Sequence, residues 1–400
     1  MKFALVGWGV RGDVEPFAAL GRELSRRGHE VRMAVVPSMV WLVEAAGLAA
    51  VAYGPDTRGQ NDWGLDLSDL NPFSMLTQAI ERGTRTWEEK SATLMSLAGG
   101  ADVLVASITE QGLAANVAEY HGIPLVVPFF TPMRFSLGGW LFSLVTKQAE
   151  DAQRRALGLP EAGPSTGQAS LEMHAYDGLC FSALPTEWAE QGAPRCVGAL
   201  ALELPTNADD EVLSWIADAS PPIYFGFGSM QVPAQTIAMI SAACAQLGER
   251  ALVCAGWGDF THANPPFDHV KIVDELNYAA IFPACRAVVH HGGTGTTAAS
   301  LRAGIPTLIL PTSPDQKLWA HVVTHLEVGC GRPFSNVTEK SLVADLHAIL
   351  TAHCAARARE VATQMTKPAE SAARAADLLE ETARVGRAPS IAGDSMPDPR

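Results

Sequence analysis

Positive charge is scarce in this chain. Its 400 residues include 29 Lys and Arg against 43 Asp and Glu, which gives a formal net charge of −14 at pH 7. So acidic a protein repels nucleic acid and anionic lipid, and neither is an expected partner. A phosphate-bearing ligand would have to be held by local backbone and side-chain groups rather than by the overall charge.

Long hydrophobic runs are absent as well. Nowhere do about eighteen apolar residues follow one another, the length that a transmembrane helix needs. Lys2 is followed at once by a short apolar run that enters a glycine turn, which is not the layout of a signal peptide. We therefore expect a soluble, cytoplasmic protein without a transmembrane segment, and leave peripheral contact with a membrane open.

Cysteine spacing typical of a metal site is missing too. The 7 cysteines are odd in number and scattered along the chain. A cytosolic protein keeps such thiols reduced in its core. The sequence therefore predicts reduced core cysteines and no bound metal.

A glycine turn near the start lacks the partner that a dinucleotide site requires. Residues 7–12 carry the pattern G-x-G-x-x-G after an apolar run, which is the dinucleotide-binding fingerprint. Such a site needs a carboxylate at the end of the second strand, but the strand expected over residues 31–38 ends on Pro37 and Ser38. Asp13, directly after the last glycine, would also repel a pyrophosphate. Both features weaken the hypothesis of a nicotinamide oxidoreductase and indicate another chemistry for this turn.

Strand-like and helix-like segments alternate along both halves of the chain, which predicts two doubly wound α/β domains with parallel sheets. Two such domains facing each other would place a ligand cleft between the carboxyl ends of both sheets. The expected division is a Rossmann-like domain at 1–201, an acidic, proline-rich linker at 202–222, a second Rossmann-like domain at 223–369, a C-terminal helix at 370–384 and a disordered tail at 385–400.

The pattern also predicts the bounds of individual helices and of two irregular segments. The first helix is expected over residues 14–27, beginning close to Pro16, and the helix after the second glycine motif over residues 296–303. Two long segments, residues 54–89 and 131–163, break the alternation and carry several aromatic side chains. Such segments either face a ligand or pack as a lid on the core.

The most informative stretch covers residues 286–320. Gly292, Gly293 and Gly295 lie there between a buried strand and a helix expected to begin at Thr296. The first N–H groups of a helix have no partner within it, so they can bind an anion. A purely structural turn between strand and helix is the alternative.

Polar side chains flank this motif. His291 stands at the end of the strand and can add a hydrogen-bond donor for a phosphate. Asp315 and Gln316 follow the next buried strand. A carboxylate and an amide together suit the hydroxyl groups of a sugar, since one accepts hydrogen bonds and the other both donates and accepts them.

The two motifs together resemble a known family. G-x-x-G-D-x-x-P over residues 9–16 and HHGGTGTT…GIP…P…DQ…WA over residues 290–320 resemble glycosyltransferase family 1, which has the GT-B fold. The bacterial branch that acts on glycopeptide antibiotics, macrolides and mycobacterial glycolipids is the most similar. The resemblance implies an inverting, metal-independent enzyme. It would move a sugar from a dTDP-, UDP- or GDP-sugar to a hydroxyl of a hydrophobic acceptor such as a glycolipid, lipopeptide or natural product.

The resemblance also implies roles for single residues. Asp13 matches the catalytic base, which would take the proton from the acceptor hydroxyl. The donor diphosphate would be bound by Ser229, His291, Gly293, Gly295 and Thr296. The nucleobase would be bordered by Trp257 and the backbone near Leu276, and the donor sugar held by Asp315 and Gln316. Val10 stands where the family often has Ser or Thr, so a hydroxyl contact to the diphosphate is lost.

Two other functions share the expected fold and stay open. A sugar-nucleotide epimerase would not need the two aromatic segments, and it lacks the Asp-Gln pattern in this form. A non-catalytic protein that only binds a sugar nucleotide would need the donor-binding motifs and no others. Release of nucleoside diphosphate in the presence of an acceptor would separate a transferase from both.

Overall fold

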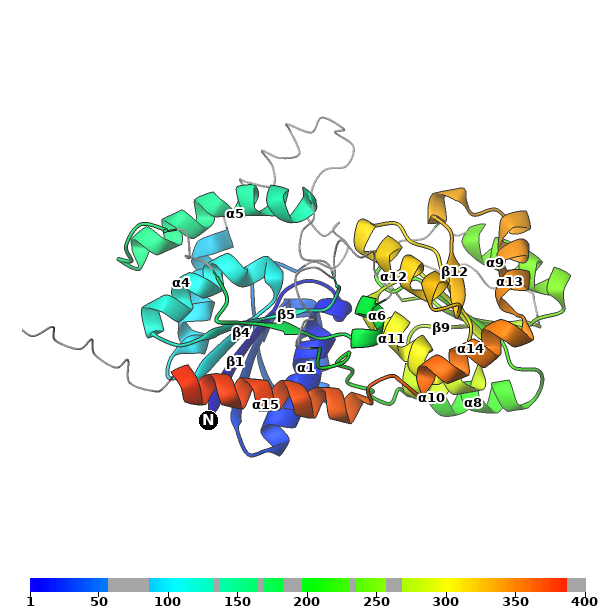
Figure 1. Ribbon diagram of the computed structural model, residues 1–400, viewed down its shortest axis with the longest axis horizontal. Helices are drawn as coiled ribbons and strands as arrows, with labels where there is room; N and C mark the ends of the chain where they lie inside the picture. The colour runs from blue at the N-terminus through cyan, green and yellow to red at the C-terminus, as the bar shows by residue number, and fades with distance from the viewer. Residues whose placement is uncertain are drawn as a thin grey trace, which may run out of the picture.

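The computed structural model describes residues 1–56, 86–132, 137–163, 168–182, 196–230, 233, 235–256 and 268–386. Figure 1 shows two α/β lobes side by side, the first coloured blue to green and the second green to orange. The last helix, in red, lies along the first lobe. Within the described residues, no helix is long and apolar enough to cross a membrane.

The first lobe alternates strands and helices. Its elements are β1 (Lys2–Gly7), α1 (Arg11–Arg26), β2 (Glu30–Val35), η1 (Pro37–Met39), α2 (Val40–Ala45), β3 (Ala49–Ala52), β4 (Val103–Ala106), η2 (Ile108–Glu110), α4 (Gln111–His121), β5 (Leu125–Phe129), α5 (Leu137–Ala156), β6 (Leu171–His174) and α6 (Gly178–Ser182). Residues 86–98, just before β4, are also helical.

The second lobe repeats the alternation and ends in a helix that returns to the first. Its elements are α8 (Asp209–Ala217), β7 (Ile223–Gly226), α9 (Gln235–Leu247), β8 (Ala251–Cys254), β9 (Val270–Val273), α10 (Tyr278–Ile281), η3 (Phe282–Ala284), β10 (Ala287–His290), α11 (Thr294–Ala303), β11 (Thr307–Ile309), α12 (Pro314–His325), β12 (Gly329–Gly331), η4 (Phe334–Asn336), α13 (Glu339–Ile349), α14 (Ala352–Ala362) and α15 (Pro368–Gly386).

Each lobe is built on a six-stranded parallel sheet. The strand orders are β3-β2-β1-β4-β5-β6 and β12-β11-β10-β7-β8-β9, which are the same order in terms of each lobe's own chain sequence. The order reverses between β1 and β4 in the first sheet and between β7 and β10 in the second. Ligands of doubly wound sheets bind at such reversal points, outside the carboxyl ends of the strands. The prediction of two doubly wound α/β units is confirmed.

The strand β1 shows how alternating side chains build two cores around one sheet. Phe3 and Leu5 are buried in a cluster with side chains of α1 and α15, whereas Ala4 and Val6 are buried in a cluster with side chains of α4. Successive residues of a strand point to opposite faces, so both faces of the first sheet are covered by helices. This is why the strand is apolar at nearly every position.

The helix α15 completes the core of the first lobe. Ala375, Ala376, Leu379 and Ala383 are fully buried in the same cluster as Phe3. A helix at the end of the chain is thus part of the lobe that the start of the chain builds.

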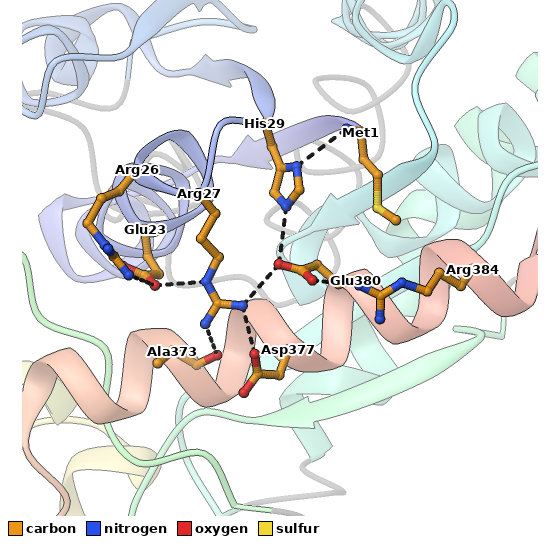
Figure 2. Close-up of polar contacts among 9 residues, drawn as sticks. All are labelled: Met1, Glu23, Arg26, Arg27, His29, Ala373, Asp377, Glu380 and Arg384. Atoms are coloured by element: carbon orange, nitrogen blue, oxygen red, sulfur yellow. Dashed lines mark hydrogen bonds and ion pairs between the residues drawn. The ribbon is translucent and has the colours of Figure 1, made fainter.

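Polar contacts fasten α15 at its border with α1 (Figure 2). Arg27 donates hydrogen bonds to Asp377 at 2.7 Å and to Glu380 at 3.0 Å. His29 lies between the amino group of Met1, 3.3 Å from Nδ1, and Glu380, 3.1 Å from Nε2. The hydrogen bonds from Arg27 and His29 lower the pKa of Glu380 to about 2.

Charged side chains also join the lobes at the far end of α11. Arg302, in the last turn of α11, donates to the carbonyl oxygens of Ala199 at 2.5 Å and Thr366 at 2.9 Å. Asp177, in the first lobe, accepts the N–H of Thr366 at 2.7 Å. The helix α11 is therefore anchored against the first lobe by its carboxyl end.

The boundaries of α1 and α15 differ from the expectation. The helix α1 begins at Arg11, not at residue 14, because the Asp13 carboxylate accepts the N–H of Val10 at 2.9 Å and caps an extra turn. Pro16 then lies inside the helix. The last helix covers 368–386, so Val385 and Gly386, expected in the tail, are helical.

Three short strands were not expected from the sequence. They are β3, β6 and β12, of which β3 is mostly exposed and β12 is the tripeptide Gly-Cys-Gly. Such segments have little intrinsic strand preference and are formed by backbone pairing with the neighbouring strand.

We expect Leu379→Ala to lower the free energy of unfolding by roughly 2–5 kcal/mol, the usual cost of emptying a fully buried leucine site. Glu381→Ala, an exposed change on the same helix, should alter it by less than about 0.5 kcal/mol. Urea unfolding followed by circular dichroism measures both. Equal effects of the two variants would show that α15 does not contribute to the core of the first lobe.

Candidate functional site

The loop after β7 packs directly on His291. Gly228 has a φ of +58°, and a Cβ built on it would lie 2.9 Å from Cε1 of His291. Only a glycine allows this approach at this backbone conformation. The loop therefore places the expected diphosphate contact Ser229 beside His291, although the two are far apart in the sequence.

The helix α11 begins at Thr294, two residues earlier than expected. Gly293 is its N-cap residue and offers no side-chain cap, and the first hydrogen bond within the helix runs from the N–H of Thr297 to the oxygen of Gly293 at 2.9 Å. The N–H groups of Thr294, Gly295 and Thr296 precede that bond and remain for an anion. A Cβ built on Gly295 would meet no described atom within 4 Å, so this helix end borders open space.

Thr294 and two residues that contact it were not among the expected site residues. The Thr294 hydroxyl oxygen accepts a hydrogen bond from the indole N–H of Trp319 at 3.0 Å and lies 3.5 Å from the hydroxyl oxygen of Thr131. Because an indole N–H can only donate, the Thr294 hydrogen is left to donate elsewhere. Thr131 follows β5, so both lobes meet at the start of α11. The threonine run after the glycines was a signal for Thr294, whereas nothing in the pattern pointed to Thr131.

The two histidines at the end of β10 have different roles. His290 is fully buried and accepts the N–H of Gly292 at 3.0 Å, and burial together with neighbouring His291 lowers the pKa of His290 well below its usual value. Burial also lowers the pKa of His291, against the opposing effects of the Gly226 backbone and the Asp315 carboxylate. Among the described residues, Nδ1 of His291 has no hydrogen-bond partner. Nε2 of His290 likewise has none, so what distinguishes His291 is its place against Gly228 and Gly293, next to the start of α11, whereas His290 holds the backbone turn.

The third loop of the site follows β11 and begins α12. Gln316 accepts the N–H of Thr312 at 2.8 Å and its hydroxyl at 3.0 Å, which holds the start of the helix. The Thr312 hydroxyl also lies 3.7 Å from the sulfur of Met230, next to Ser229. Asp315 is half-buried in the first turn and close enough to His291 to affect its pKa. The loops after β7, β10 and β11, on three adjacent strands, thus converge on one point.

Two further residues were expected near a nucleobase, Leu276 and Trp257. Leu276 is buried in the core beneath α10, so only its backbone could border a ligand. Trp257 lies outside the described residues.

The first lobe presents Asp13 at the start of α1. Its Oδ2 atom accepts the N–H of Val10, and a Cβ built on Gly9, whose φ is +139°, would lie 2.2 Å from that same oxygen. Arg11, beside it, pairs with Glu15 at 2.7 Å and reaches Glu275 of the second lobe at 3.6 Å. The start of α1 therefore faces the second lobe, and the backbone N–H of Val10 is bonded to Asp13.

Two doubly wound lobes of identical strand order, with polar loops gathered at their reversal points, have the architecture of the GT-B fold. Residues 3–135 match the glycosyltransferase family 28 N-terminal domain, and residues 259–381 match the C-terminal domain of erythromycin biosynthesis protein CIII-like proteins. The chain is 53% identical to an uncharacterized glycosyltransferase of Mycobacterium leprae, over 96% of this chain and 97% of that protein. This identity and coverage show that the chain belongs to the same glycosyltransferase family as the Mycobacterium leprae protein.

Other relatives and solved structures agree with this assignment. An uncharacterized glycosyltransferase of Mycobacterium tuberculosis is 50% identical over 97% of this chain and 100% of its own. A sterol 3-beta-glucosyltransferase of Arabidopsis thaliana is 29% identical over 90% of this chain and 65% of its own. The calicheamicin glycosyltransferase CalG4 has the same fold, with a TM-score of 0.73, 18% identity and coverage of 97% and 98% of the two chains. Glycosyltransferase VinC in complex with dTDP has a TM-score of 0.68 at 18% identity, with coverage of 96% and 99%.

The buried histidines make stability depend on pH. Because the pKa values of His290 and His291 are lowered in the folded protein, the unfolded chain binds protons there below about pH 6.5 that the folded protein does not. The free energy of unfolding should therefore fall as the pH falls below that value, by up to about 1.4 kcal/mol per pH unit for each histidine.

Urea unfolding between about pH 8 and pH 5 measures this slope. His290→Asn keeps an acceptor for the N–H of Gly292 but cannot take up a proton, so its slope should be smaller than that of the wild type. Its stability near pH 8 supplies the control, because both histidines are neutral there in either state. A slope as steep as that of the wild type would exclude His290 as a source of the pH dependence.

Proposed function

We propose that the chain is an inverting, metal-independent glycosyltransferase of the family 1 type. It moves a sugar from a nucleoside-diphosphate sugar to a hydroxyl group of a hydrophobic acceptor. The observation that carries the proposal is the uncapped start of α11 in the second lobe, next to His291, together with Asp13 at the start of α1 in the first lobe. The second lobe would hold the donor and the first lobe the acceptor and the base.

The diphosphate would lie against the first turn of α11. The N–H groups of Thr294, Gly295 and Thr296 and the positive end of the helix dipole favour an anion there. His291, with its proton on Nδ1, would donate a further hydrogen bond, and Ser229 lies beside it. Together these groups would stabilise the negative charge of the departing nucleotide, the task that a metal ion performs in other enzymes. VinC with dTDP supports a thymidine nucleotide as the first probe.

Asp13 would act as the general base. Inversion requires the acceptor hydroxyl to attack the face of the sugar opposite the departing diphosphate, and α1 and α11 belong to opposite lobes. The hydrogen bond from Val10 holds the carboxylate in place. An ionised carboxylate is a weak base, but the proton leaves late, when the attacking hydroxyl has become acidic.

The hydrophobic acceptor is supported by the sequence resemblance and by one of the relatives. A sterol glucosyltransferase among the relatives supports a hydrophobic acceptor. The mycobacterial relatives are uncharacterized and name no acceptor, so a glycolipid acceptor is proposed from the sequence resemblance alone. The aromatic segments expected to bind it, 54–89 and 131–163, are described only in part, so their role stays a prediction.

Asp13→Asn should lower turnover by about a hundredfold or more, because a positioned base contributes on that order. Asparagine keeps an oxygen that can accept the N–H of Val10, so the cap and the fold should be retained. Release of dTDP from a dTDP-sugar, with a lipid extract as acceptor, measures turnover. Asp13→Ala should in addition lose about 0.5–2 kcal/mol of stability with the cap. Wild-type turnover in Asp13→Asn would remove Asp13 from the chemistry.

His291→Ala should weaken binding of dTDP by roughly 1–3 kcal/mol, the cost of a charged hydrogen bond lost at a phosphate. Calorimetry in excess chelator measures the affinity without a metal ion. His321→Ala, on the exposed side of α12, is the matched control and should bind like the wild type. Binding that requires added Mg²⁺, or that is equal in both variants, would contradict the placement of the diphosphate at α11.

A further inference from the structure

A buried charged cluster lies behind the loop that carries Asp13. Lys90 and Glu110 form an ion pair of 2.7 Å, with their side chains 10% and 2% exposed. Tyr53 is fully buried and donates its hydroxyl hydrogen to the other oxygen of Glu110. Burial and the nearby Glu110 carboxylate raise the pKa of Tyr53 well above its usual value, so the hydroxyl keeps its proton. We call Trp8, Tyr53, Lys90 and Glu110 the Lys90 cluster.

Through Trp8, the Lys90 cluster contacts the turn that leads from β1 to Asp13. The Lys90 ammonium lies 4.0 Å from the centre of the Trp8 ring, a cation–π contact. Gly54, with a φ of +63°, leaves room for this contact, because a Cβ there would lie 2.8 Å from Lys90 Cε and 3.3 Å from the Trp8 nitrogen. Lys90 is thus held in one position from three sides, by a carboxylate, a ring and a backbone turn.

Trp8 is followed directly by the two residues that hold Asp13. Gly9 has a φ of +139° and its α-carbon lies against the Asp13 carboxylate, and Val10 donates its N–H to that carboxylate. The position of the Trp8 ring therefore determines where the turn, and with it the carboxylate, can lie. β1, β4 and the segments after them meet at the reversal point of the first sheet, so the cluster and the turn share one edge.

Stability alone does not account for such a pair. Removing two charges from water costs about as much as their attraction returns, and apolar replacements of buried ion pairs are often neutral or stabilising. In some proteins a buried charged pair instead fixes one arrangement of its neighbours, which matters where a reacting group must be placed accurately.

We propose that the Lys90 cluster is a positioning device for the Asp13 carboxylate, acting through the Trp8 ring and the Gly9–Val10 turn. The proposal rests on the proposed role of Asp13 as base. Lys90 and Glu110 touch neither substrate nor donor. Their removal should lower kcat and leave the affinity for dTDP unchanged.

The double variant Lys90→Met, Glu110→Gln tests this without leaving a lone buried charge. Methionine keeps the unbranched stem, and glutamine keeps an oxygen for the Tyr53 hydroxyl. We expect kcat to fall about ten- to hundredfold, since a small misplacement of a reacting group costs that much. The same pair of changes in an Asp13→Asn background should lower kcat by less than about twofold, because residues that act as a unit are not additive.

The outcomes separate this proposal from the one on which it rests. An unchanged kcat in the double variant, or an equal loss in both backgrounds, overturns the positioning role. Wild-type turnover of Asp13→Asn overturns the base and this proposal together.

A second pair of variants covers the case in which the double variant does not fold. Trp8→Phe keeps an aromatic face for the ammonium and Trp8→Leu does not, while both leave the ion pair whole. Trp8→Phe should keep kcat within about threefold of the wild type, and Trp8→Leu should lose about tenfold or more, with dTDP affinity unchanged in both. Equal kcat values for the two variants would overturn the role of the cation–π contact.

Discussion

Close approach of side chains to the backbone at glycines is the constraint on which both halves of the site depend. A Cβ on Gly9 would lie 2.2 Å from the Asp13 carboxylate, and one on Gly228 would lie 2.9 Å from the His291 ring. Both glycines have positive φ values, which other residues adopt only with strain. A side chain at either position would push the expected base or the expected phosphate ligand out of place. Gly9 and Gly228 therefore provide space for the Asp13 carboxylate and the His291 ring.

Both ends of α11 contact the first lobe. Its first turn carries the proposed anion site and meets Thr131 of the first lobe, while Arg302 in its last turn is bonded to Ala199 and Thr366. The chain then continues through α15 into the core of the first lobe. The two lobes are thus joined at both ends of α11.

The sequence predicted the buried strands and the site loops that directly follow them. Runs such as that of β10 are apolar because parallel strands are covered on both faces, and polar residues after them must lie at the carboxyl edge. The start of α1 was predicted wrongly, because a helix start depends on which side chain accepts an N–H group, here Asp13 with Val10. The strand β12 could not be predicted, since pairing with β11 forms it and its own residues do not favour it.

What the sequence by itself determined is the repeated alternation, the glycine turns after β1 and β10, and residue types suited to phosphate and sugar, because these depend on local pattern and chemical character. Only the tertiary structure decided that Thr131 and Trp319 meet Thr294, that α15 returns to the first lobe, and that Lys90 lies over Trp8. These contacts join residues that are far apart along the chain. Their partners are chosen by the packing of whole helices and sheets, which no local pattern records.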